Sequence, residues 1–148
     1  MAVEALTEWT IVADEVFVFY GDGGEFRGEQ VERWLQELPA SGVRKYIGAT
    51  GLSFQMTGDV RKRCNAVLKT QQIKFATITD SALVRGFTTA ASWFGIDIAA
   101  FAWKDLEPAT RWLKLENAVA QEALACVHRH RSAVSQKLAA REVRSARR

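Results

Sequence analysis

The strongest constraint on the fold is the way the spacing of apolar residues changes along the chain. Short runs rich in β-branched and aromatic residues are typical of strands, and they occur at residues 9–13, 16–20, 43–49, 73–78 and 96–101. Between these runs apolar residues recur at helical spacing, which predicts helices that begin near residues 25, 57, 81 and 105. The predicted order is therefore β-β-α-β-α-β-α-β-α.

The connections between these elements decide how the strands pair. Only Asp14 and Glu15 separate the first two strands, which predicts a tight antiparallel hairpin. Each later strand follows a helix, and strands joined through a helix pair in parallel with right-handed crossovers. We therefore expect an α/β fold with a mostly parallel five-stranded sheet, an N-terminal hairpin and helices packed on the sheet. The 148 residues are enough to bury such a core without disulfides.

Charge divides the chain into two parts. Residues 1–115 hold 13 basic and 14 acidic side chains, whereas residues 116–148 hold 7 basic and 3 acidic ones. We predict an α/β domain over residues 1–115 and a basic C-terminal extension over residues 116–148, helical or partly disordered. The near-neutral domain lacks the basic balance that is typical of a nucleic-acid-binding surface.

The last predicted helix can be followed into this extension. Leu113, Ala120, Val127 and Val134 are spaced by seven residues, so the helix also offers a surface through which an oligomer would form. A helix that frays beyond about Gln121 is the alternative. Because the extension has few large apolar groups, we expect truncation after Gln121 to leave a folded domain with a similar melting temperature.

Nothing in the sequence indicates export or insertion into a membrane. The first residues include Glu4 and Glu8 instead of the basic start and apolar run of a secretory signal. The most apolar region, residues 75–103, is interrupted by charged side chains, so no membrane span is predicted. Cys64 and Cys126 do not make a disulfide framework. We therefore expect a cytoplasmic protein.

Side chains that commonly carry catalysis or bind metals are sparse. The two histidines, His128 and His130, lie two positions apart, which places them on different faces of a helix. Cys126 and His130 can share a face, but two ligands do not make a zinc site. Cys64 has the spacing of a core residue on the second helix rather than of a nucleophile. We therefore expect no catalytic residue, no metal, no cofactor and no enzyme activity.

Three tryptophans, Trp34, Trp93 and Trp112, fall on the apolar stripes of predicted helices. We expect them to pack in the core rather than to stack on nucleic-acid bases. In the helix that begins near residue 81, the expected apolar face comprises Leu83, Val84, Phe87, Ala90, Ala91 and Phe94.

Two stretches of the sequence resemble a known family. Residues 52–58 read LSFQMTG where the third strand leads into the second helix, and residues 78–86 read ITDSALVRG. Together with the order of elements over about residues 9–115, these stretches resemble the STAS domain family of anti-sigma-factor antagonists, in a divergent bacterial branch. The resemblance implies a STAS-like fold and a non-enzymatic regulatory protein that binds another protein in signalling.

In that family the loop before the second helix often carries a phosphorylated serine that acts as a switch. Where the family has Asp-Ser-Ser/Thr, this chain has Met56, Thr57 and Gly58, so only Thr57 can take the phosphoacceptor place. Thr57 is also a good N-cap, which by itself accounts for a threonine there. The partner-binding surface that the resemblance implies comprises Leu52, Ser53, Phe54, Gln55, Met56, Thr57, Gly58, Asp59, Arg61 and Lys62.

Two other functions stay open from the sequence. A carrier of a small ligand or lipid needs an unfilled apolar pocket, which a sequence does not reveal. A protein that binds nucleic acid or another acidic surface would use the basic extension, through Arg129, Arg131, Lys137, Arg141, Arg144, Arg147 and Arg148.

Overall fold

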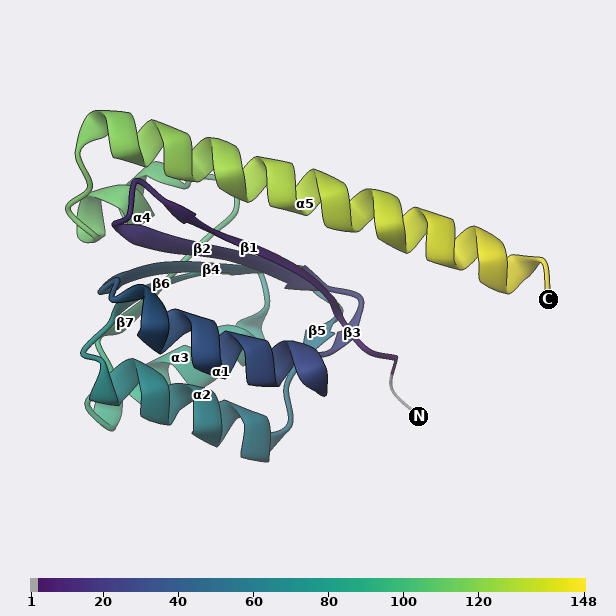
Figure 1. The fold of residues 1–148 in the computed structure, drawn as a ribbon, viewed down its shortest axis with the longest axis horizontal. Coiled ribbons are helices and arrows are strands. Elements are labelled where there is room, and N and C mark those ends of the chain that lie inside the picture. The colour runs from purple at the N-terminus through teal and green to yellow at the C-terminus, as the bar shows by residue number, and fades with distance from the viewer. Residues whose placement is uncertain (1–2) are drawn as a thin grey trace.

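In the computed structural model, which describes residues 3–148, a five-stranded sheet separates two layers of helices (Figure 1). The first two strands are antiparallel and the other neighbouring strands are parallel, which confirms the predicted hairpin and the mostly parallel sheet. In their order across the sheet, the strands are β1 (Leu6–Val12), β2 (Val16–Asp22), β4 (Lys45–Thr50), β6 (Lys74–Ile78) and β7 (Ile98–Phe101).

The helices divide between the two faces of this sheet. Figure 1 shows three of them on one face, α1 (Glu29–Ser41), α2 (Gly58–Thr70) and α3 (Ala82–Trp93). The opposite face is covered by α4 (Glu107–Trp112) and by the long α5 (Asn117–Ala146), which runs across the hairpin of β1 and β2.

Each central strand contributes to two separate cores. Side chains alternate between the faces of a strand, so Phe17 and Phe19 of β2 pack toward α1 and α2, while Val16 and Val18 pack toward α4 and α5. A strand that is buried on both faces reads as an unbroken apolar run. This is why residues 16–20 show no polar alternation.

The prediction of a single last helix is wrong, because the structure has two helices there, α4 and α5. Lys114 has a φ of 56°, a left-handed conformation that a helix of L-residues does not continue through. The amide of Leu115 donates instead to the carbonyl of Thr110, closing the end of α4. The turn lets Leu113 and the apolar stripe of α5 both face the sheet.

The stripe spaced by seven residues is buried by the sheet of the same chain. Val127 and Val134 have no exposed surface, and both belong to the core that includes β2 and β4. Helix α5 is continuous to Ala146, so the alternative of fraying beyond Gln121 is not what the structure shows. The boundary expected between residues 115 and 116 falls in the α4–α5 turn, but the core of the domain extends into α5.

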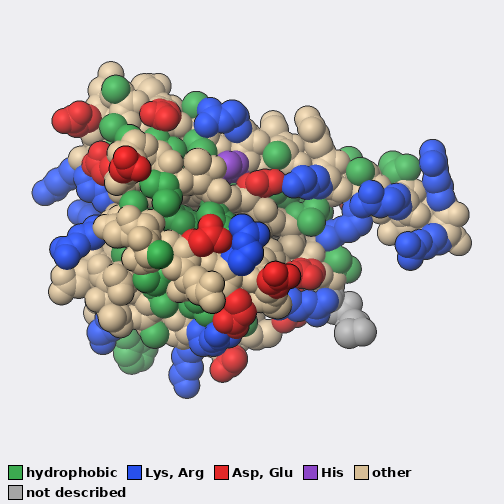
Figure 2. All heavy atoms as spheres, viewed as in Figure 1, with side chains coloured by type: hydrophobic (Ala, Val, Ile, Leu, Met, Phe, Trp, Pro, Cys, Tyr) green, Lys and Arg blue, Asp and Glu red, His purple; other side chains and the backbone are tan. Residues whose placement is uncertain are grey.

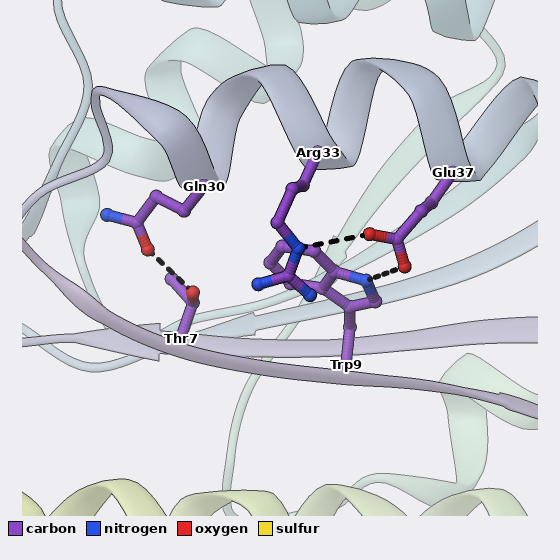
Figure 3. Close-up of polar contacts among 5 residues, drawn as sticks. All are labelled: Thr7, Trp9, Gln30, Arg33 and Glu37. Atoms are coloured by element: carbon purple, nitrogen blue, oxygen red, sulfur yellow. Dashed lines mark hydrogen bonds and ion pairs between the residues drawn. The ribbon is translucent and has the colours of Figure 1, made fainter.

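Polar side chains fix α1 over the edge strand β1 (Figure 3). The hydroxyl of Thr7 donates to Gln30 Oε1 at 2.7 Å, and Trp9 Nε1 donates to Glu37 Oε1 at 3.2 Å. Arg33 pairs with the same carboxylate at 3.2 Å and lies over the Trp9 ring at 4.8 Å. Edge strands are often shielded by such covering elements.

The three tryptophans differ in how they pack. Trp34 is buried and donates from Nε1 to the Tyr46 hydroxyl at 2.8 Å, as a core residue should. Trp112 is half-buried against Phe101, with ring centroids 5.9 Å apart. The prediction for Trp93 is wrong, because its side chain is 79% exposed at the end of α3.

The predicted apolar face of α3 is also partly wrong. The side chains of α3 that are buried are the small ones, Thr88 and Ala91, whereas Leu83, Phe87 and Phe94 are exposed. The helix packs mainly against β7, the short edge strand, and not over the centre of the sheet. An apolar stripe on an edge helix is therefore wider than the surface available to cover it.

Removing α5 is expected to unfold the domain rather than leave it intact, contrary to the sequence-based expectation. Truncation after Gln121 deletes the buried valines Val127 and Val134, and burying one such side chain stabilises a protein by about 1.5–3 kcal/mol. We expect the truncated protein to lose more than about 3 kcal/mol of unfolding free energy in urea denaturation.

The matched control is truncation after Glu142, which removes only exposed residues and leaves the buried stripe in place. This shorter deletion should leave the denaturation midpoint nearly unchanged. Equal midpoints for both truncations and the full chain would contradict a shared core.

Candidate functional site

A cavity of about 460 Å³ lies between the sheet and helices α2 and α3. Its wall is formed mainly by aromatic and aliphatic side chains. Four lining residues are exposed, Leu52 and Gln55 before α2 and Leu83 and Phe87 on α3, so the mouth of the cavity opens between the β4–α2 loop and the start of α3. Deep lining residues include Trp34, Tyr46, Leu68, Phe75 and Ile98.

The cavity exists because small residues face one another across this layer. On the sheet, the positions that point toward α2 and α3 hold Gly48 and Thr50 of β4 and Thr77 of β6. On α3 the facing residues are Thr88 and Ala91. None of these side chains is long enough to fill the space between the layers, whereas protein interiors are normally close-packed.

Gly48 allows two aromatic rings to form the floor of the cavity. Tyr46 and Phe75 are paired on neighbouring strands, and their rings stack with centroids 4.4 Å apart. A Cβ atom on Gly48 would lie 2.6 Å from Phe75 Cζ and 2.7 Å from Tyr46 Cε1, too close for either ring to stay. The absence of a side chain at Gly48 therefore allows the two rings to stack and leaves open space above them.

Two titratable groups in the wall, the Cys64 thiol and the Tyr46 phenol, are held neutral. Burial raises the pKa of the Cys64 thiol to about 12, so the thiol stays protonated at neutral pH. Burial also raises the pKa of Tyr46 well above its usual range, and the hydroxyl accepts a hydrogen bond from Trp34. A protonated thiol and a neutral phenol behave as nearly apolar wall groups, unlike a nucleophile and its base.

Two hydroxyls in the wall have no hydrogen-bond partner among residues 3–148. They belong to Thr50, the last residue of β4, and to Thr77, which is only 5% exposed and pairs with Gly48 across the sheet. An unpaired buried hydroxyl costs about 1–3 kcal/mol of stability. Groups of this kind are uncommon in native proteins, where most buried polar atoms have a hydrogen-bond partner.

Arg61 is the one charged side chain among the described residues that line the cavity. It is half-buried on the first turn of α2, and its guanidinium lies 3.9 Å over the ring of Phe87 at the mouth. The contact joins α2 to α3 across the opening. Asn65 lies one helical turn further along the same face of α2 and also lines the cavity.

A short second sheet, which the sequence analysis missed, holds the loop at the mouth. Strand β3 (Gly24–Glu25) pairs in parallel with β5 (Phe54–Gln55), where no strand is predicted. The predicted start of the first helix near residue 25 is therefore wrong, because Glu25 belongs to β3 and α1 begins at Glu29. The carboxylate of Asp22 accepts from the amides of Gly23 at 2.8 Å and Ser53 at 3.1 Å. These bonds fix the backbone from which the loop side chains project.

The structure divides the predicted partner-binding residues into two groups. Leu52, Phe54, Gln55, Met56 and Arg61 line the cavity, and Phe54 also stacks edge-on against Phe19. The remaining residues are exposed to solvent: Ser53, Thr57, Gly58, Asp59 and Lys62.

The predicted capping role of Thr57 is confirmed. Its hydroxyl oxygen accepts from the amide of Val60 at 3.2 Å, and α2 begins at the next residue. The side chain is nevertheless exposed, so the hydroxyl lies at the surface at the N-terminus of the helix. The loop therefore presents Thr57 to solvent while its neighbour Met56 lines the cavity.

Some basic residues of α5 contact the rest of the domain, and others do not. Arg131 lies over the Trp103 ring at 4.2 Å, Lys137 pairs with Glu8 at 2.6 Å, and Arg141 donates to the backbone carbonyls of Glu4 and Gly23. These contacts hold α5 to the body. The other predicted tail residues are exposed: Arg129, Arg144, Arg147 and Arg148. Figure 2 shows Lys and Arg side chains gathered on the projecting end of α5.

Cys126 and His130 are in contact on α5, with Cys126 Sγ 3.2 Å from His130 Nε2. Burial raises the pKa of the thiol and lowers the pKa of the imidazole, so both are neutral near pH 7. Within residues 3–148 no three His, Cys, Asp or Glu side chains lie together as a metal site would require. In the same part of the chain, every helix is too short or too polar to cross a bilayer.

The cavity was missed by the sequence analysis, which treats the apolar faces as filled. A weak signal was available in Gly48, because a glycine inside a strand often marks a close approach of neighbouring groups or a ligand. Thr50 and Thr77 interrupt otherwise apolar positions in the same way. Gly48 and Thr50 lie two residues apart in one strand and so face one layer, but only the structure brings Thr77, Thr88 and Ala91 to the same cavity.

Replacing the unpaired hydroxyl should stabilise the protein. In Thr77→Val the buried oxygen is lost without a large change in shape, and we expect the unfolding free energy to rise by about 1 kcal/mol. Thr79→Val is the matched control, since Thr79 is also buried but its hydroxyl oxygen accepts from Ser81 N at 3.0 Å. That variant should be destabilised. Urea denaturation measures the unfolding free energy of both variants. An equal loss of unfolding free energy in the two would show that the Thr77 hydroxyl has a hydrogen-bond partner.

No protein-family model and no curated protein matches this chain.

Proposed function

We propose that this protein is a non-enzymatic binding module that holds a small, largely apolar ligand in the cavity between the sheet and helices α2 and α3. The main support for this proposal is the cavity itself, which has a volume of about 460 Å³ and an apolar wall that includes a few polar groups. Sites for small molecules typically have about 300–1,000 Å³ and this kind of lining.

The position of the cavity supports the proposal. Thr50 ends β4, and Thr77 is the last residue but one of β6, so the polar wall groups lie near the carboxyl ends of two parallel strands. In open α/β sheets, ligands bind at that end of the strands. The neutral state of Cys64 and Tyr46 suits binding better than acid–base or nucleophilic chemistry.

Filling the cavity should abolish binding without unfolding the protein. Ala91→Leu places a larger side chain into the space from α3, whereas Ala66→Leu makes the same change at an exposed position of α2 outside the cavity. We expect the wild-type protein and Ala66→Leu to bind the apolar dye Nile red with one-to-one stoichiometry, as seen in fluorescence titration. Ala91→Leu should bind at least about tenfold more weakly.

Native mass spectrometry of the protein from its own host gives a second measurement. A bound small molecule should be present on the wild-type chain and absent from Ala91→Leu. Saturable dye binding that is the same in wild type and Ala91→Leu would place the ligand elsewhere and contradict the proposal.

A regulatory interaction with another protein is the second candidate, as the resemblance to anti-sigma-factor antagonists implies. The observation that favours it is the exposure of the loop before α2, where Leu52 is 77% exposed and Thr57 presents its hydroxyl to solvent. Phosphate on Thr57 would add about −1.5 to −2 charge at the N-terminus of α2, where the helix dipole tolerates it. The two unpaired cysteines suit the reducing cytoplasm as the place of this function.

Charge at Thr57 should weaken binding of such a partner. In Thr57→Glu the fold should survive, because loss of the cap costs only about 0.5–2 kcal/mol. Thr57→Ala removes the cap without adding charge and serves as the control. Affinity for a partner purified from the host should fall for Thr57→Glu alone, as measured by calorimetry. If neither variant changes the affinity, the partner does not dock on this loop.

A further inference from the structure

The charge distribution in the cavity wall bears on the chemistry of the ligand. The lining described above contains one guanidinium, that of Arg61, and no carboxylate from residues 3–148. A charge that is half-buried against apolar surface is costly unless it is paired. The wall itself supplies no such pairing.

Arg61 differs in this respect from a neighbour on the same helix. Arg63 pairs with Glu32 at 2.8 Å, whereas none of the ion pairs among residues 3–148 includes Arg61. The Arg61 guanidinium instead stacks over Phe87 at 3.9 Å. Stacking uses the face of the planar group, so the N–H donors at its edge stay available to an anion.

Neutral hydrogen-bonding groups accompany this cation. The Asn65 amide lies one turn from Arg61 on α2, and the side chain of Gln55 on the β4–α2 loop also lines the cavity. The part of the wall around Trp34, Leu68 and Phe75 is apolar. A molecule with a single anionic group and an apolar body would match both parts of the cavity.

We infer that the ligand is an amphiphilic carboxylic acid whose carboxylate binds Arg61 near the mouth and whose apolar body fills the space between the sheet and helices α2 and α3. A carboxylate matches the fork of a guanidinium with two parallel hydrogen bonds. Its charge of −1 is balanced by Arg61 alone. A phosphate monoester carries about −1.5 to −2 and would leave charge unbalanced in a half-buried site.

The inference rests on the proposed function and is tested with pairs of ligands that differ only in the charged group. The probes are the saturated acids from octanoate to tetradecanoate and their matched primary alcohols, titrated into the full chain by calorimetry. We expect at least one acid to bind about tenfold or more tightly than its alcohol, and added salt to weaken the acid alone.

Two variants test whether Arg61 causes the preference for the acid over the alcohol. In Arg61→Gln the acid should lose about tenfold or more in affinity, while the alcohol of the same length keeps its affinity. Lys69→Gln removes a charge from an exposed position of the same helix outside the cavity and should bind both as the wild type does.

The possible failures are distinguishable. Equal binding of acid and alcohol to the wild-type protein overturns the carboxylate inference but leaves the apolar cavity in use. Retention of the acid preference in Arg61→Gln also overturns the inference, because another group then holds the carboxylate. Binding of neither acid nor alcohol at any chain length contradicts both the inference and the proposed function.

Discussion

Burial of both faces of the sheet is the constraint on which the rest of the structure depends. The side chains of β2 and β4 must fill two cores at once, and the strict alternation of a strand assigns each residue to one of them. On the face toward α4 and α5, branched residues such as Val18, Ile47 and Ile78 are fully buried in one core. On the other face Gly48 and Thr77 meet the small residues of α3, and the layer is left incomplete. The cavity is thus a consequence of which residues occupy alternate positions in two neighbouring strands.

Helix α5 stabilises the cavity mouth although it lies on the opposite face of the sheet. Arg141 donates to the carbonyl of Gly23, in the turn between β2 and β3. The next residue, Gly24, donates to Ser53 at 3.0 Å and so connects this turn to the loop before α2. The basic extension therefore contributes to the order of the loop through a short path of hydrogen bonds. The sequence predicted its helix and its charge, but the charge alone gave no sign that Arg141 contacts backbone at the far end of the chain.

The strands, the hairpin and the capping role of Thr57 could be predicted because each depends on local chemistry: β-branched runs, a two-residue connection and a hydroxyl before a helix. The break at Lys114 and the exposure of Trp93 could not. Helical spacing shows that a face is apolar, but it does not show whether another element covers that face. Helix α3 lies at the edge of the sheet beside a strand of four residues, so its stripe has too little surface to pack against. The cavity escapes prediction for the same reason, since it depends on small residues from three elements that are distant in the sequence.

The two proposed functions are compatible because different side chains of the β4–α2 loop line the cavity and lie at the surface. Phe54 and Met56 turn inward and line the cavity, whereas Ser53 and Thr57 lie at the surface. A ligand that contacts the inward side chains acts on the same backbone that presents the outward ones. That backbone is held by β3 and by Asp22 but not by a second strand on its outer side. If the cavity binds a ligand as proposed, we expect a shift of these few residues to change the surface around Thr57 while the core beneath α5 keeps its packing.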